Sequence, residues 1–408
     1  MSGRPRVLLL TNSLVVGGAE TQFTHLALHL HGAGYPVLIA TILPDGEDRP
    51  ELAAAGIPHE VLPLRSPVRG VTAVGGAVRL LRRWKPDVLI SFLFYANVLG
   101  RLAAAVAPVP VVVSSVRTER FGGWMSDLAF RFTNPLASLI VTNSRVTARR
   151  LVRDRIVRKD RIRVIPNGVP LGDFAGSHDR ETIRRALGVS AEEFLWLAVG
   201  RLEAVKDYPT LLRATATLRN SGLAFAVRIA ADGSQRAPLE ALADDLHVSD
   251  IARFLGLRHD VPALLDASDA LVLASLWEGL PNVVIEAMAT GVPVVATNRG
   301  GTTELIEPGI TGFLVPPRDE RALADAMEHL MRLPVAVRRG MGEAGRRFVS
   351  ERFALDRVMG LWEQLIAELT GSRSSQTLDL RTMSDASTVV RGGPVAPMHT
   401  AGRKYERP

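Results

Sequence analysis

The sequence predicts a protein of two α/β domains, each built on a parallel sheet with helices on both faces. First, a chain of 408 residues is too long for one ordinary hydrophobic core. Second, short apolar runs alternate with amphipathic helical stretches along most of the chain, which is typical of βα units. Third, the segment from Leu271 to Thr297 holds a complete unit of strand, loop, helix and strand.

Composition narrows the class of protein. The content of 47% hydrophobic and 22% charged residues is that of a globular chain, and there is no Cys to form disulfides or thiolate metal sites. No apolar run reaches the roughly 18 residues of a transmembrane helix, and the N-terminus enters a strand instead of a secretory pattern. We therefore expect a cytoplasmic protein. The net charge of +7 favours acidic partners such as nucleotide diphosphates or anionic lipids.

The first domain opens with a β–loop–α–β unit. A buried strand is predicted from Val7 to Leu10, a helix from Ala19 to Leu30, and a second strand from Val37 to Ile42. The glycine pair Gly17 and Gly18 stands at the crossing point between strand and helix. The full G-x-G-x-x-G spacing is missing, so a dinucleotide-binding loop is not predicted.

The remaining elements of this domain follow the same alternation. The predicted strands are Val61 to Leu64, Val88 to Phe92, Val109 to Ser114 and Leu139 to Val141. The predicted helices between them are Val71 to Trp84 and Asn97 to Val106. A last strand ends in the turn signal Pro–Asn–Gly, within Arg163 to Val169. The polar stretch Asp173 to Arg180 is then the predicted linker.

The second domain begins with a strand from Leu195 to Val199, and Asp207 is the predicted N-cap of the helix that follows. Further predicted elements are the strands Val227 to Ala230 and Arg253 to Gly256, and the helices Asp319 to Arg332, Val335 to Val349 and Phe353 to Leu369. After Gly371, Ser, Thr, Gly and Pro are frequent and no period remains, which indicates a disordered tail.

The loop and helix after Leu273 carry the most chemistry. Pro281 suits the first position of a helix, where its missing N–H costs nothing. The free N–H groups of Asn282, Val283 and Val284 would then point out of the helix start. Such a helix start binds anions, phosphate above all.

Two carboxylates flank this helix start, with seven residues between them. Glu286 lies over a turn further along the helix, where it could hold a ribose attached to a bound diphosphate. Glu278 lies in the loop on the other side of the phosphates, where a sugar would be. The segment could thus hold both ends of a nucleotide sugar.

The E-x7-E pattern in WEGLPNVVIEAMATGVPVVAT, with the later G-x-x-G-F-L-V-P-P run, resembles the signature of retaining glycosyltransferases of family 4, which have the GT-B fold. The resemblance extends more loosely from about Arg6 to Leu369. It implies two doubly wound, Rossmann-like α/β domains facing each other across a cleft. The implied divisions are an acceptor-side domain at 1–172 with helix 353–370 packed back on it, a donor domain at 173–352, and a disordered tail at 371–408.

The resemblance also implies roles for single residues. GGAE resembles the family's G-G-x-E loop, which lies against donor phosphates and acceptor, and GRLEAVK resembles a segment whose Arg201 and Lys206 hold the diphosphate. Two cations suit a leaving group whose negative charge grows during transfer. The implied catalytic residues are Glu278, Arg201 and Lys206. The implied nucleotide-sugar-binding residues are Gly17, Gly18, Gly279, Leu280, Asn282, Val283 and Glu286. No metal and no cofactor are expected.

The sequence allows more than one role for two basic features. Arg117 stands where many family members have a His, and it is a candidate contact for an anionic group on the acceptor. In the basic stretch Arg145 to Arg163, the side chains of Arg145, Arg149 and Arg153 share one helix face. This face could lie on an anionic membrane or be simply solvated. Nucleic acid is disfavoured, because no aromatic residues interleave to stack on bases.

The predicted function is transfer of a hexosyl unit from a nucleotide-diphosphate sugar to a hydroxyl of a glycan, glycolipid or lipid-linked intermediate, in the cytoplasm or at the inner face of the membrane. A first alternative is a non-hydrolysing sugar-nucleotide epimerase, which shares the GT-B architecture but does not need the E-x7-E pattern. A second is a non-catalytic nucleotide-sugar or membrane-binding protein. The presence of the charged residues Arg201, Lys206, Glu278 and Glu286 argues against it. The sequence leaves open the donor sugar, its base, the acceptor and the oligomeric state.

Overall fold

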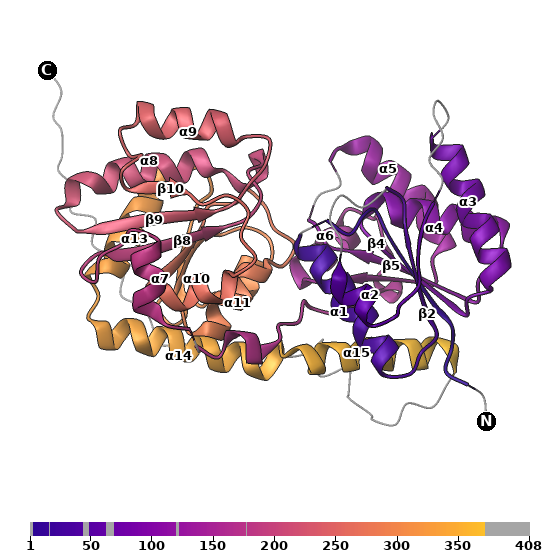
Figure 1. Ribbon diagram of the computed structural model, residues 1–408. Coiled ribbons are helices and arrows are strands. Elements are labelled where there is room, and N and C mark those ends of the chain that lie inside the picture. Colours follow the sequence, from indigo (N-terminus) through magenta and orange to yellow (C-terminus); the bar gives the residue numbers. More distant parts are fainter. Residues whose placement is uncertain are drawn as a thin grey trace, which may run out of the picture.

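The protein consists of two α/β lobes, each with its own parallel sheet (Figure 1). The structure is a computed structural model that describes residues 3–15, 17–43, 49–62, 69–119, 122–176 and 178–371. The predicted disordered tail, apart from Gly371, lies outside the described residues. The predicted fold class of two Rossmann-like domains is confirmed.

The first sheet has seven parallel strands in the order β3-β2-β1-β4-β5-β6-β7. Its strands are β1 (Val7–Thr11), β2 (Val37–Thr41), β3 (His59–Val61), β4 (Val88–Phe92), β5 (Val111–Val116), β6 (Leu139–Thr142) and β7 (Ile162–Val164). The central strands are buried on both faces, because Val7 and Leu9 pack into one core while Leu8 and Leu10 pack into another. This two-sided burial explains why the strands read as continuous apolar runs.

Helices cover both faces of this sheet. They are α1 (Gly18–Gly32), α2 (Pro50–Ala54), α3 (Arg69–Trp84), α4 (Phe94–Val106), α5 (Trp124–Thr133) and α6 (Arg145–Arg153), with short 3-10 turns η1 (Asn134–Leu136) and η2 (Lys159–Arg161). Apolar residues of α3 and α4 fill the core on one face, and those of α1 fill the other. Because the strands of this sheet are parallel, their carboxyl ends all lie at the same edge of the sheet.

The second sheet has six parallel strands in the order β10-β9-β8-β11-β12-β13. These strands are β8 (Phe194–Val199), β9 (Phe225–Ala230), β10 (Ala252–Phe254), β11 (Ala270–Leu273), β12 (Val294–Thr297) and β13 (Gly312–Val315). Phe194 and Trp196 pack into one core and Leu195 and Leu197 into the other, so this sheet is also buried on both faces.

The elements around the second sheet complete the chain. They are η3 (Leu171–Phe174), α7 (Arg180–Ala186), η4 (Ala204–Lys206), α8 (Tyr208–Leu218), η5 (Arg219–Ser221), α9 (Arg236–Asp245), α10 (Val261–Ala267), α11 (Asn282–Thr290), α12 (Thr302–Leu305), α13 (Glu320–Arg332), α14 (Val335–Arg352) and α15 (Leu355–Thr370). Among the described residues, no helix combines the length and apolar character that crossing a bilayer requires.

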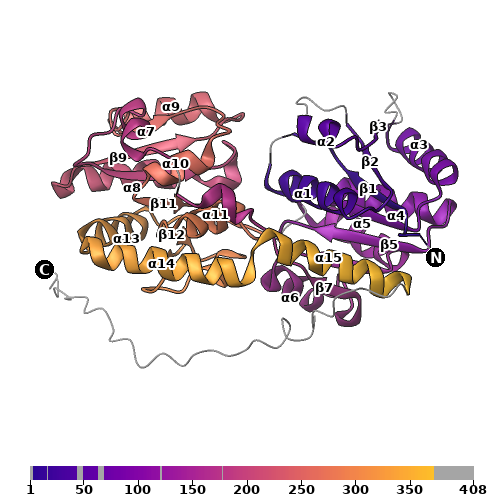
Figure 2. The same ribbon diagram turned by 60° about the horizontal axis from the view of Figure 1, so that its bottom comes forward.

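The last two helices span both lobes. Figures 1 and 2 show α14 running along the second lobe and α15 continuing beneath the first. Val358, Trp362 and Leu365 of α15 are buried in the core of the first sheet. The chain passes between the lobes at two adjacent points, because Val169 N–H donates to Phe353 O (2.8 Å) and Leu355 N–H to Val169 O (2.9 Å). These paired crossings bring the two sheets to face each other.

Several predicted boundaries need correction. The strand predicted from Val61 to Leu64 is β3, which starts earlier at His59; residues 63–64 lie outside the described residues. The predicted linker Asp173 to Arg180 overlaps the turn η3 and the first residue of α7. Asp207 does occupy the N-cap position of α8, but its carboxylate accepts from the Thr210 hydroxyl (2.8 Å) instead of a backbone N–H.

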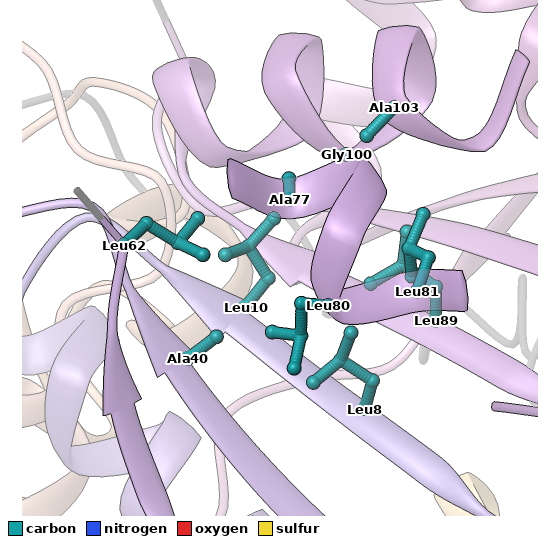
Figure 3. A pocket seen from close by; sticks show the side chains of 10 residues that line it. All are labelled: Leu8, Leu10, Ala40, Leu62, Ala77, Leu80, Leu81, Leu89, Gly100 and Ala103. Atoms are coloured by element: carbon teal, nitrogen blue, oxygen red, sulfur yellow. The ribbon is translucent and has the colours of Figure 1, made fainter. Parts of the chain in front are cut away.

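A small cavity lies inside the first lobe, between strands β1, β2 and β4 and helices α3 and α4 (Figure 3). Leucine, alanine and glycine residues line it, including Leu8, Leu10 and Leu80. It has no polar side chain that could bind a sugar or phosphate, and it is therefore not a candidate for the functional site.

Candidate functional site

The predicted site residues gather where the strand order of each sheet reverses. In the first sheet the reversal lies between β1 and β4, and in the second between β8 and β11. Open α/β sheets bind ligands outside the carboxyl ends of strands at these points. Gly17 and Gly18 follow β1, Arg201 and Lys206 follow β8, and Glu278 follows β11. The topology thus brings all three predicted loops to the ligand-binding edges.

Glu278 is held by two donors of its own domain. Lys206 Nζ donates to Glu278 Oε1 at 2.6 Å, and Ser275 Oγ donates to the same oxygen at 2.7 Å. The side chain of Lys206 is only 20% exposed and that of Glu278 only 14%, so water screens their attraction weakly. Beneath them, burial raises the pKa of Tyr208, and the charge of Glu278 adds to this effect. The carboxylate is therefore fixed next to a cation in a partly buried setting.

Arg201 is more open than Lys206. Its guanidinium pairs with Glu203 at 3.2 Å and is 62% exposed. Its charge also acts across the domains on Glu20 of α1. Burial raises the pKa of Glu20, while the positive charges of Arg201 and Arg49 oppose that rise. The site thus contains a carboxylate of the first domain that interacts with the predicted diphosphate clamp of the second.

Helix α11 provides the predicted anion-binding end. Pro281 is the extended N-cap residue and Asn282 the first helical residue, which corrects the predicted placement of Pro281 by one position. Gly291 ends the helix in the left-handed conformation, as a C-terminal glycine usually does. Three N–H groups at the start of α11 have no partner within the helix, as at any helix N-terminus.

Glu286 lies on the second turn of α11 and is half-buried. Within the described residues, no side chain pairs with its carboxylate. Burial raises the pKa of Glu286 to about 7. Partial burial of a carboxyl group without a protein partner disfavours its charged form, and hydroxyl donors of a ligand would lower that cost.

Side-chain amides join the two domains at the start of α11. Asn282 Nδ2 donates to Gly18 O at 3.0 Å, so the glycine loop of the first domain touches the predicted phosphate site directly. Asn167, in the turn after β7, donates through Nδ2 to Asn282 Oδ1 (2.6 Å) and Leu280 O (2.8 Å). The two domains are therefore in contact at this point, and the cleft between them is closed here.

Gly279 lies against the first domain with no room for a side chain. A Cβ atom there would collide with the carbonyl oxygen of Arg117. The backbone of the Glu278 loop is thus in direct contact with the segment after β5. This close approach requires glycine at position 279.

The Arg117 side chain points inward, which corrects the expectation of an exposed contact for the acceptor. Its Nε donates to Ser115 Oγ (2.8 Å) and its Nη1 to Asn167 Oδ1 (2.9 Å). The guanidinium also lies over the ring of Phe92, 4.6 Å from its centroid. Burial lowers the pKa of Arg117 to about 9, so the group still carries its charge at neutral pH. It supports Asn167 from below and does not reach into the cleft.

Sequence reasoning missed several residues of this site. Glu20 lies in the GGAE segment, and Asn167 lies in the Pro–Asn–Gly turn, so both had a local signal. Ser275 and Tyr208 had no such signal. Ser275 follows an apolar strand and Tyr208 begins a helix, and neither sequence pattern indicates which charged residue lies nearby in the fold. Leu280 and Val283, both predicted to bind the nucleotide sugar, have buried side chains and can contribute only their backbone groups.

Comparison with known proteins gives two family matches that together cover most of the chain. Residues 179–348 match the family model described as "Glycosyl transferases group 1", and residues 16–173 match the one described as "Glycosyltransferase Family 4". The two matches correspond to the second and first sheets.

Individual relatives agree with these matches. The chain is 30% identical over 374 residues to a glycogen synthase of Mycobacterium tuberculosis, covering 83% of this chain and 88% of that protein. It is also 30% identical over 264 residues to the UDP-Gal:alpha-D-GlcNAc-diphosphoundecaprenol alpha-1,3-galactosyltransferase of Escherichia coli, covering 61% and 67%. Among solved structures, HepE of Anabaena in complex with UDP and glucose superposes with a TM-score of 0.80 at 25% identity, covering 91% and 100%.

Proposed function

The chain belongs to the glycosyltransferases of family 4 and group 1, and from this premise we propose that it moves a hexosyl unit from a nucleotide-diphosphate sugar to a hydroxyl acceptor with retention at the anomeric carbon. Membership of a transferase family favours this reading over the epimerase and over a non-catalytic binding protein. The donor sugar, the acceptor and the stereochemistry are proposals, supported by the relatives and by the family resemblance.

One observation carries the proposal: positive charge and carboxylates meet at the ligand-binding edge of the second sheet. Arg201, Lys206 and the start of α11 supply the positive charge, and Glu278 lies 2.6 Å from Lys206. A diphosphate leaving group gains negative charge as its bond to the sugar breaks. Preorganised cations and N–H groups stabilise that charge most strongly in the transition state. We infer that no metal ion or cofactor is needed, because these groups supply the same stabilisation.

The two glutamates have different roles in this proposal. Glu286, with no partner among the described residues, holds the ribose hydroxyls of the donor. Glu278, fixed by Lys206 and Ser275, holds hydroxyls of the transferred sugar or stabilises positive charge at its anomeric carbon. Losing a contact made only in the transition state lowers kcat, whereas losing a ground-state contact raises KM.

The proposed reaction breaks the bond between the anomeric carbon and the diphosphate oxygen and forms a bond to the acceptor oxygen on the same face of the sugar. The acceptor's proton passes to the departing phosphate oxygen, so no protein side chain has to become a covalent nucleophile. The engagement of Glu278 with Lys206 supports this assignment, because a paired carboxylate is a weaker nucleophile.

Relatives suggest the class of substrates. HepE is described in complex with UDP and glucose, and the Escherichia coli relative is named for a UDP-sugar donor and a diphosphoundecaprenol-linked acceptor. We therefore propose a UDP-hexose as the first donor to test, and a glycan, glycolipid or lipid-linked sugar as the acceptor.

A lipid-linked acceptor would require contact with a membrane, and helix α5 offers a suitable surface. Trp124, Leu128 and Phe132 share one face of the helix, and Trp124 and Phe132 are both 74% exposed. The exposed Arg131 lies on the same helix, and Arg161 donates to Pro135 O (3.5 Å) in the turn that follows. Exposed aromatic residues with basic neighbours suit the interface of an anionic bilayer.

Vesicle sedimentation tests this contact. We expect the protein to bind vesicles of phosphatidylglycerol more than vesicles of phosphatidylcholine at low salt, and salt to weaken the binding by screening. The double variant Trp124→Ala/Phe132→Ala should bind less, whereas Ile310→Ala, at an exposed apolar residue of the other domain, should bind normally. Equal binding to both vesicle types at low salt would contradict this part of the proposal.

The experiment that tests the proposed activity is a turnover assay with a panel of nucleotide sugars. Thermal shift first selects the donor, because a ligand that binds only the folded protein raises the midpoint of unfolding. Transfer then predicts free nucleoside diphosphate in step with a glycosylated acceptor. Epimerised sugar nucleotide without diphosphate release would instead support the epimerase, and binding without turnover would support a non-catalytic protein.

A further inference from the structure

A carboxylate of the second domain caps a helix of the first. Glu304, on the short helix α12, accepts from Arg145 N–H through Oε2 (3.1 Å) and from Val146 N–H through Oε1 (2.8 Å). These are the first two residues of α6. The next N–H, of Thr147, donates to the N-cap residue Ser144 (3.0 Å). A carboxylate at a helix N-terminus is stabilised both by these hydrogen bonds and by the helix dipole.

The turn that carries Glu304 is also packed against the backbone of the Glu278 loop. Gly301 N–H donates to Glu278 O at 3.3 Å. Neither Gly300 nor Gly301 has room for a Cβ atom, because the carbonyl oxygens of Glu278 and Gly279 occupy that space. The position of this turn therefore fixes the backbone position of the loop.

The turn itself is tied to the sheet. The Thr302 hydroxyl lies within hydrogen-bond distance of Thr297 O (2.6 Å) and Arg299 O (2.8 Å), which links the start of α12 to the end of strand β12. A displacement of Glu304 is consequently passed on through the glycine pair to Glu278. On its far side the Glu278 loop lies against Arg117 of the first domain, through Gly279.

We propose that Glu304 is a positioning residue, which latches the two domains through the N-terminus of α6 and thereby holds the Glu278 loop against the first domain. This inference rests on the proposed function for its effect on catalysis, but the latch itself is a property of the fold. Most of the proposed donor contacts, including those of Arg201, Lys206 and Glu286, belong to the second domain. Loss of the latch should therefore lower kcat and leave donor affinity nearly unchanged.

The latch is tested by the distance between the domains in solution. The chain has no Cys, so a pair introduced at the exposed residues Lys159 and Asp325 gives one spin label in each domain. We expect one narrow distance distribution for the otherwise wild-type protein and a longer, broader one for Glu304→Ala. Glu307→Gln is the matched control, because it removes a charge from an exposed side chain three residues along, and its distribution should match the wild type. An unchanged distribution in Glu304→Ala would overturn the latch.

Kinetics test the link to catalysis, with UDP-glucose as the first donor probe. We expect kcat of Glu304→Ala to fall about tenfold or more, the usual range of coupling between two sites, with donor KM changed less than about threefold. Glu304→Gln keeps one accepting oxygen and the same shape, so its kcat should lie between those of Glu304→Ala and the wild type. This variant serves as the control in case Glu304→Ala misfolds. An open distance distribution with unchanged kcat would overturn the positioning role. If the wild type turns over no nucleotide sugar, the proposed function fails, while the distance measurement still decides the latch.

Discussion

At the scale of single residues, the site is organised by where charge is buried and what neutralises it. Lys206 is partly buried against Glu278, whereas Arg201 is open and faces Glu20 of the other domain. The two cations are thus held differently although the same motif supplies both. Lys206 is held by Glu278, whereas the exposed side chain of Arg201 is accessible for the proposed diphosphate contact.

The first prediction concerns this diphosphate clamp. Arg201→Ala and Lys206→Ala should each lower kcat by about 10²–10³, the scale for losing one preorganised stabiliser of developing charge. Arg213→Ala is the control, because Arg213 is an exposed arginine on α8 with only a distant ion pair to Glu320 (3.9 Å). Steady-state kinetics measure the effect and thermal melting confirms folding. Unchanged kcat in both clamp variants would remove the assignment.

The second prediction is a pH dependence from Glu286. Burial raises its pKa to about 7, and in the proposed role it is the ionised form that would accept the two ribose hydroxyls. Glu286 therefore takes up a proton as pH falls through about 7, and we expect donor binding to weaken as the pH falls. We expect kcat/KM for the donor to fall about tenfold from pH 8 to pH 6, since this ratio reports groups of the free enzyme.

The variant Glu286→Gln gives the control for this profile. Its amide cannot ionise, so the profile should be flat between pH 6 and pH 8, with a KM raised at the upper end. A wild-type profile that is flat, or one that rises toward acid pH, would contradict the role of Glu286. A slope that persists in Glu286→Gln would assign the titration to another group.

At the scale of elements, the sequence predicted the strands and long helices well, because parallel strands buried on both faces read as continuous apolar runs. The predicted strand from Val88 to Phe92 coincides with β4, and the predicted unit of strand, loop, helix and strand from Leu271 to Thr297 corresponds to β11, α11 and β12. The short helices α7 and α10 were not predicted. Helix α7 has seven residues, most of them polar, and it is stabilised by buried Arg184 contacts that no local pattern reveals.

The third prediction contrasts two glycines. Gly279→Ala places a Cβ against Arg117 O, so the Glu278 loop must move; a displacement near 1 Å can cost about 10²-fold in rate. Gly340→Ala lies inside helix α14 with open space around it, and replacing a helical glycine should stabilise folding by about 0.5–1 kcal/mol with normal activity. Denaturant melts and kinetics on both variants check this. Normal activity in Gly279→Ala would show that the close approach of the domains is not required.

At the scale of the whole molecule, the site exists because two sheets present their ligand-binding edges to each other. The motifs located Arg201, Lys206, Glu278 and Glu286, since each motif is local in sequence. The contacts across the cleft could not be predicted in the same way. Asn282 and Gly18 lie 264 positions apart, and Glu304 and Arg145 lie 159 apart, so only the fold brings them together.

The central claim is a transfer in which departure and attack occur on the same face of the sugar, so that the product keeps the anomeric configuration of the donor. The anomeric configuration of the first-formed product tests it most directly. Proton NMR of the anomeric signal, recorded during turnover of an α-configured nucleotide sugar, should show an α-linked product at the earliest times. A β-linked first product would contradict the mechanism.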